Sequence, residues 1–197
     1  QARRFVDFSW LLATALAYQA GISVVIALAA IYATEVLGFA QTETMMLVFL
    51  VNIASAVGAF AFGYWQDRTG HRRALAVTLA GWIVMCVLAA ATRSAALFWL
   101  AAVIAGLCMG SSQSAGRAIA GLLAPPDRLA EFFGLWAFAT RLSAIVGPLT
   151  YGFVTWASGG NHRLAIVSTA LFFVAGLVLL RQVDVQRGAA RALEATA

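Results

Sequence analysis

Six continuous apolar stretches, separated by short charged or turn-rich pieces, divide this chain almost from end to end. They cover residues 10–33, 44–65, 74–91, 95–114, 132–157 and 164–180. A helix needs about 20 mostly apolar residues to cross a bilayer, whereas a barrel strand would alternate apolar and polar residues over about ten. The pattern predicts an all-α membrane protein, with six transmembrane helices in residues 1–183 and a cytoplasmic tail over 184–197.

Composition excludes the soluble alternatives. Of the 197 residues, 62% are hydrophobic and only 11% are charged, against about 45–50% and about 25% in an ordinary soluble domain. A soluble enzyme, a disordered regulator and a coiled-coil rod are therefore ruled out.

The basic residues are all arginines, and their distribution predicts the orientation of the chain. Ten fall on one side of the expected spans, two on the other, and Arg141 falls inside a span. The ten are Arg3, Arg4, Arg68, Arg72, Arg73, Arg117, Arg128, Arg181, Arg187 and Arg191, and the two are Arg93 and Arg163. Cytoplasmic loops collect basic residues, so we expect both termini in the cytoplasm and the lipid bilayer, rather than nucleic acid, as the partner of this charge. An Arg-only set is typical of a GC-rich bacterial genome, which favours the bacterial inner membrane.

No pattern in the sequence indicates an enzyme, a cofactor or a metal. Cys86 and Cys108 lie in apolar stretches and are expected to pack, and His71 and His162 have no ligand spacing around them. The first residue is Gln, so we expect the chain to be a piece of a longer one.

One short motif carries the first family resemblance. From Gly63 to Arg73 the sequence reads GYWQDRTGHRR, which resembles the signature loop of the major facilitator superfamily. The expected gating-loop residues are Gly63, Asp67, Arg68, Gly70, Arg72 and Arg73. Gly63 would admit a neighbouring helix, Gly70 would allow a turn that a β-carbon disfavours, and Asp67 would accept from local arginines or a helix N-terminus.

Downstream motifs narrow the resemblance. Gln113-Ser-Ala-Gly-Arg117, Pro125-Pro-Asp-Arg128-Leu-Ala-Glu131-Phe-Phe-Gly134, Gly147-Pro148 and Leu171-Phe-Phe173 follow in order. This series is similar to the C-terminal half of the vacuole-effluxer-like family, which includes bacterial relatives of a yeast vacuolar amino-acid exporter. Two positions depart from many relatives: Gln19-Ala20 replaces an Asn-Asp pair, and Thr140-Arg141 replaces Gly-Lys.

The resemblance implies one half, built as a three-plus-three inverted repeat, of a twelve-helix transporter with a binding site between its two halves. The partners would be an N-terminal six-helix half and a small solute. The resemblance places Gln19, Gln113 and Arg117 toward the substrate cavity, and Asn52 and Arg141 near the seam between the halves. In the superfamily, a kinked fifth helix such as Gly147-Pro148 would give is associated with exporters.

Arg141 is also informative on physical grounds alone. It lies roughly 14 Å along its helix from Phe132, near mid-bilayer. A guanidinium there costs at least about 2.5–3.5 kcal/mol unless it meets water, an acid or carbonyls. None of the six expected apolar stretches holds Asp or Glu, so the partner is an acid on another half, backbone carbonyls, cavity water or an anionic group of the substrate.

These observations favour a secondary transporter half that exports a small polar solute, such as an amino acid, by alternating access. Two alternatives stay open. A non-transporting scaffold or sensor with the same fold would also lack an intramembrane acid, and a half-size transporter would work as a homodimer.

Overall fold

Six long helices dominate the computed structural model, which describes residues 5–92 and 94–194. They are α1 (Val6–Leu37), α2 (Gln41–Thr69), α3 (His71–Ala91), α4 (Ala95–Leu123), α5 (Leu129–Ala157) and α6 (His162–Leu180). A 3-10 turn, η1 (Pro126–Arg128), precedes α5, and a short helix, α7 (Val185–Glu194), follows α6. The described residues include no strand, and all six long helices are long and apolar enough to span a membrane. The all-α six-span class is confirmed.

Each helix extends past the expected apolar stretch at one or both ends. The extra turns carry polar residues such as Asp7 and Gln66, which the criterion of an apolar run leaves out. Backbone hydrogen bonds continue the helix beyond the hydrocarbon layer, because helix formation does not require apolar side chains.

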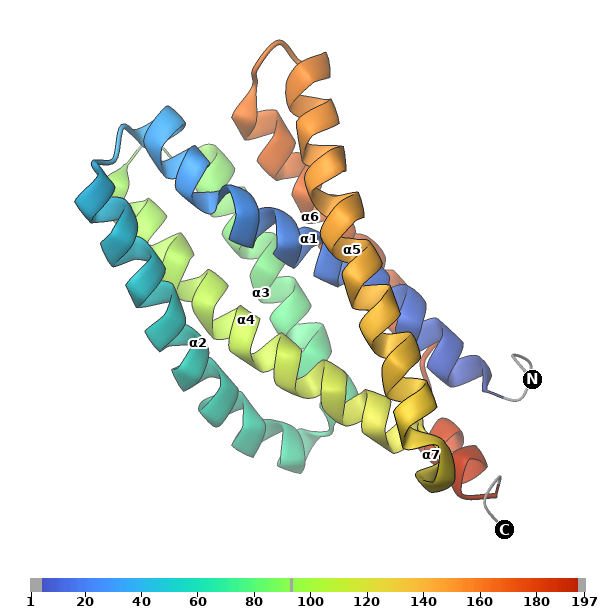
Figure 1. Cartoon of the computed structure of the whole chain (residues 1–197). Helices are drawn as coiled ribbons and strands as arrows, with labels where there is room; N and C mark the ends of the chain where they lie inside the picture. The colour runs from blue at the N-terminus through green and yellow to red at the C-terminus, as the bar shows by residue number, and fades with distance from the viewer. Residues whose placement is uncertain (1–4, 93, 195–197) are drawn as a thin grey trace.

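The packing of the helices repeats between the first three and the last three. In Figure 1, α2 lies along α4, and α5 lies along α1. Helix α3 packs on α4, α6 packs on α1, and α3 and α6 pack on each other. When α1, α2 and α3 are exchanged for α4, α5 and α6, the α2–α4 pair becomes α5–α1, the α3–α4 pair becomes α6–α1, and the α3–α6 pair becomes itself. Because each triplet has an odd number of spans, the two run in opposite directions, as an inverted repeat requires.

Two arginines fasten α3 and α6 to each other at both ends. Each helix begins with a His-Arg pair, His71-Arg72 in α3 and His162-Arg163 in α6. The Arg72 guanidinium donates to the carbonyl of Arg181, which follows α6, at 2.9 Å. The Arg163 guanidinium donates to the carbonyls of Ala90 and Thr92 at the end of α3, at 3.2 and 3.1 Å. Cations at helix C-termini satisfy carbonyls that have no intrahelical donor.

Small residues let backbones meet at the α2–α4 crossing. A Cβ at Gly106 would lie 2.6 Å from the Val51 carbonyl oxygen, and one at Gly110 would collide with the Ser55 carbonyl. Gly58 of α2 meets the backbone of α4 at Leu107 in the same way. The spacing of small residues in α4 therefore marks a contact between helix backbones.

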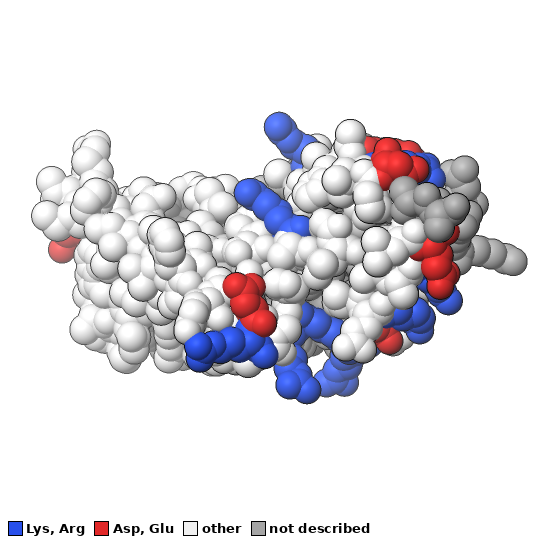
Figure 2. All heavy atoms as spheres, turned by 90° about the horizontal axis from the view of Figure 1, so that it is seen from below, with Lys and Arg blue, Asp and Glu red and all other residues white. Residues whose placement is uncertain are grey.

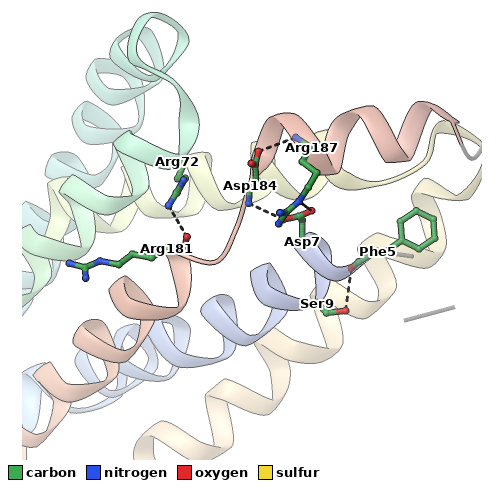
Figure 3. Close-up of polar contacts among 7 residues, drawn as sticks. All are labelled: Phe5, Asp7, Ser9, Arg72, Arg181, Asp184 and Arg187. Atoms are coloured by element: carbon green, nitrogen blue, oxygen red, sulfur yellow. Dashed lines mark hydrogen bonds and ion pairs between the residues drawn. The ribbon is translucent and has the colours of Figure 1, made fainter. Parts of the chain in front are cut away.

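The C-terminal tail forms a docked helix. Val185, Gly188 and Ala192 turn toward the bundle, with Gly188 against Leu123 of α4 and Asp7 of α1. Asp7 is buried, at 1% exposure. Its carboxylate accepts from the Arg187 guanidinium at 2.6 and 3.0 Å and from the Asp184 backbone N–H at 2.9 Å (Figure 3). The hydrogen bond to Asp7 raises the pKa of Arg187.

The charged side chains gather at one end of the molecule. We call the end at which α1 begins and α6 ends the terminal end, and its opposite the far end. Figure 2 shows most basic side chains over the terminal end and hardly any charge at the far end. Arg3, Arg4 and Arg93 lie outside the described residues.

Helices α2 and α5 are buried on one stripe only. Within their apolar windows, 17% and 22% of the residues are buried, against 33–50% in the other four helices. Their exposed residues include the aromatic side chains of Phe49, Phe60, Phe138 and Phe153. Both helices flank the bundle with most of their surface uncovered by this chain.

Candidate functional site

Two glutamines meet where α1 and α4 cross. The amide nitrogens of Gln19 and Gln113 each donate to the oxygen of the other, both at 3.2 Å. Gln19 is 6% exposed and Gln113 is half-buried. The structure thus brings together two residues that the resemblance places toward the cavity, one from each half of the inverted repeat. In such a pair, each amide donates one N–H and accepts one with its oxygen. A polar solute with its own donors and acceptors could take the place of either amide in these hydrogen bonds.

The same turn of α4 makes further polar contacts. We use the name polar band for residues 113–117 of α4 together with the polar side chains of α1 and α2 that lie against them. Ser114 accepts a hydrogen bond from the Gln66 amide at 3.3 Å, and the Gln66 side-chain oxygen is buried with no hydrogen-bond partner among the described residues. The hydroxyl of Tyr18 is also buried, and it lies against Gly116 and interacts with the side chain of Gln19. Sequence reasoning missed both residues, because Tyr18 lies outside every quoted motif and Gln66 occupies a position of the signature loop that the motif leaves unspecified.

Arg117 lies at the solvent-exposed edge of the polar band. Its side chain makes no hydrogen bond or ion pair with any residue the structure describes. Helix α4 continues to Leu123, so Arg117 lies inside the helix rather than at its end. A free guanidinium thus lies one turn from Gln113, where it can meet an anionic group.

Arg141 is exposed in the middle of α5. The buried stripe of this helix includes Ala139, Ser143 and Gly147, and the Ser143 hydroxyl donates to the Leu16 carbonyl of α1 at 3.0 Å. Arg141 lies two residues from Ser143, about 200° around the helix. Its guanidinium therefore points away from this bundle, and it has no acid partner among residues 5–92 and 94–194.

Asn52 lies at the rim of an apolar cavity in the far half of the bundle. The cavity measures about 320 Å³, and its walls come from all six long helices. Its polar side chains are already engaged: Asn52 donates to the Val48 carbonyl at 2.8 Å, and Tyr32 to the Ala89 carbonyl at 2.8 Å. The lining of this cavity is mainly apolar, in contrast to the polar band.

Only one residue of the signature loop lies between helices, because the residues before it belong to α2 and those after it to α3. Gly70, with φ +93°, separates α2 from α3. Arg68 lies over the ring of Tyr64 at 4.3 Å and bonds to its hydroxyl. Asp67 is exposed, and its carboxylate makes no bond to any described residue. The expected local partners of Asp67, arginines or a helix N-terminus, are therefore wrong for this chain.

Gly63 and Gly147 have different surroundings in the structure. None of the described residues lies within 4 Å of a Cβ placed on Gly63, so the helix expected there is not one of these six. Helix α5 runs without a break from Leu129 to Ala157 through Pro148. Gly147 packs on the backbone of Ala20 in α1, which mirrors the α2–α4 crossing. The kink at Gly147-Pro148 stays a prediction.

Cys86 and Cys108 are both buried and free, and burial leaves each as a packing residue. Within the described part of the chain, no group of His, Cys, Asp or Glu side chains could hold a metal ion.

Comparison with known proteins gives one family. Residues 1–193 match the family described as "Vacuole effluxer Atg22 like". The chain is 27% identical to Autophagy-related protein 22-1 of Aspergillus fumigatus, over 98% of this chain and 34% of that protein. It is 30% identical to the Aspergillus niger protein of the same name, over 88% of this chain and 30% of that protein. The chain thus spans about a third of the length of these curated relatives.

Proposed function

The chain belongs to the vacuole effluxer Atg22-like family, and from that premise we propose that its six helices form one lobe of a secondary transporter. The family is one of effluxers rather than enzymes. The lobe would rock against a second six-helix lobe and move a small polar solute, such as an amino acid, by alternating access. Both termini would lie in the cytoplasm, because the arginines gather at the terminal end.

The uncovered faces of α2 and α5 support this proposal most directly. Aliphatic side chains alone would suit lipid, but these faces also carry Asn52 and Arg141. A guanidinium near mid-bilayer needs an acid, water, carbonyls or a polar ligand. A second lobe would supply a protein seam and a hydrated cavity at this position.

The polar band is the proposed contact surface for the solute. Gln19 and Gln113 would exchange their mutual hydrogen bonds for bonds to polar groups of the solute. Arg117 and Arg141 have no acid partner among the described residues, so either would attract a carboxylate. An amino-acid solute carries such a group.

Transport by the reconstituted protein tests the proposal. Proteoliposomes would be loaded with a ¹⁴C-labelled amino-acid mixture and would contain either this chain alone or the product of its complete gene. We expect release from the vesicles with the complete product and none with this chain alone. If neither preparation released label under any ion gradient, the transporter proposal would fail.

Two alternatives would give different results in the same assay. A homodimeric half-size transporter predicts release with this chain alone. A scaffold or sensor predicts no release with either preparation. The inner membrane of a bacterium is part of the proposal as the native location, although the relatives named above are fungal.

A further inference from the structure

Helices α3 and α6 together present a face of one chemical kind. From Ala74 to Ala91 and from Leu164 to Leu180, every exposed residue is aliphatic, including Val77, Val84, Val87, Val167, Leu171 and Val178. Ser168 and Phe172 within those ranges are partly buried, so the fully exposed residues of this α3/α6 face are all aliphatic. This separates it from the exposed faces of α2 and α5, which carry Asn52, Arg141 and four phenylalanines. Branched aliphatic surface is complementary to acyl chains.

Two arginines end this face at the terminal end. Arg73 lies four residues before Val77, and Arg181 lies three residues after Val178, so both continue the exposed stripes at helical spacing. Both side chains are exposed, and neither forms an ion pair or a side-chain hydrogen bond with a residue that the structure describes.

The bond from Arg72 to the Arg181 carbonyl holds the ends of the two helices together. Figure 3 shows this bond, with the Arg181 side chain pointing away from Asp184 and Arg187. The neighbouring carboxylates are engaged elsewhere: Asp7 accepts from Arg187, and Asp184 accepts from the Arg187 backbone N–H at 3.0 Å. Neither guanidinium is therefore ion-paired with a carboxylate of the described residues, and both lie at the end of an aliphatic surface.

We infer that this end of the α3/α6 face binds an anionic phospholipid, with its acyl chains along the aliphatic stripes and its phosphate at Arg73 and Arg181. Basic side chains at the membrane surface each favour anionic lipid, and a phosphate oxygen can accept from both guanidiniums. The inference rests on membrane residence and not on transport, so its failure would leave the proposed function untouched.

Lipid retention by the purified protein tests the inference. The full chain in mild detergent would be titrated with dioleoylphosphatidylglycerol, and bound lipid would be counted by native mass spectrometry. Dioleoylphosphatidylcholine provides the neutral lipid with the same chains, and sn-glycerol 3-phosphate provides the phosphate without chains. We expect specific retention of the anionic lipid alone.

The double variant Arg73→Gln/Arg181→Gln should weaken retention of the anionic lipid roughly thirtyfold, or about fivefold for each arginine. The matched control, Arg128→Gln/Arg191→Gln, removes two charges from the same end and should leave retention unchanged. An equal loss in both double variants, equal retention of the neutral lipid, or competition by glycerol phosphate at the lipid's own affinity would overturn the inference. Gel filtration and helical circular dichroism would show that both variants remain folded.

Discussion

Asp7 and Arg141 are both charged and both lie within helices, yet only Asp7 has its counter-charge in this chain. Asp7 is buried and bonded by Arg187, whereas Arg141 points outward with no acid among the described residues. The sequence identifies Arg141, because a lone guanidinium in an apolar run is conspicuous. It does not identify Asp7, whose partner is 180 residues away and whose helix begins before the apolar run.

Replacing Arg141 with Gln should impair transport without unfolding the lobe. The side chain makes no bond to the described residues, so the unfolding midpoint of this chain should not change. A lost charge-assisted bond costs about 1.5–3 kcal/mol, or roughly ten- to a hundredfold in solute affinity or in assembly with the second lobe. The solute dependence of efflux from proteoliposomes measures solute affinity, and co-purification of the two lobes measures their assembly. Arg128→Gln is the control, and unchanged affinity together with unchanged assembly would contradict the expectation.

The Asp7–Arg187 pair should behave as one unit in unfolding. Arg187→Gln should lower the thermal midpoint more than Asp7→Asn, because it leaves a buried carboxylate without its counter-charge. The double variant should lose less than the sum of the two single changes. Thermal unfolding in detergent, followed by circular dichroism, provides the three values. Additive losses would show that the pair does not hold α7 on the bundle.

At the scale of the helices, the four-residue spacing of Gly106 and Gly110 predicts a close crossing, and the structure places α2 against it. The partner of that face could not be predicted, because several helices could meet a small-residue stripe. The two His-Arg pairs that begin α3 and α6 were visible in the sequence. Their meaning depends on which carbonyls end the other helix, and those carbonyls become neighbours only through the fold.

Gly110→Ala tests the α2–α4 crossing. The new Cβ would collide with the Ser55 carbonyl, so α2 must shift, and overpacking of this kind typically costs about 1–3 kcal/mol. Gly152→Ala is the matched control, since no described atom lies within 4 Å of its Cβ and alanine favours the helix by roughly 0.5–1 kcal/mol. Thermal unfolding should show Gly110→Ala below the parent and Gly152→Ala at or above it. Equal midpoints would exclude a tight crossing.

At the scale of the whole molecule, the fold follows from the sequence more closely than the site does. Long apolar runs dictate membrane helices, whereas the inverted repeat is implied by the family resemblance and agrees with the pairing of the helices. The site depends on side chains from distant positions in the sequence, such as Gln19 and Gln113. The resemblance places both of them toward one cavity but does not predict the hydrogen bonds between them. Tyr18, Gln66 and Asp7 owe their roles to burial, which one sequence does not reveal.

Asp67→Asn should impair transport while leaving the lobe folded. Its carboxylate is exposed and makes no bond to the described residues, so its contribution would come from contact across the lobes in one transport state. We expect efflux to fall by about tenfold, which is typical of coupling between distant sites. Asp127→Asn, an exposed acid at the same end, is the control. Normal efflux by Asp67→Asn would remove this residue from the gating loop.

Lipid accessibility of α5 would decide whether a second lobe covers this one. A bimane label would be placed on Ile145→Cys of α5 or on Leu171→Cys of α6, both exposed positions, after replacement of Cys86 and Cys108. The product of the complete gene would then be measured in nanodiscs with brominated lipid. We predict strong quenching at residue 171 and weak quenching at residue 145, because only the α5 face meets protein. Equally strong quenching at both positions would mean that α5 and Arg141 face lipid, and that no second lobe joins these helices there.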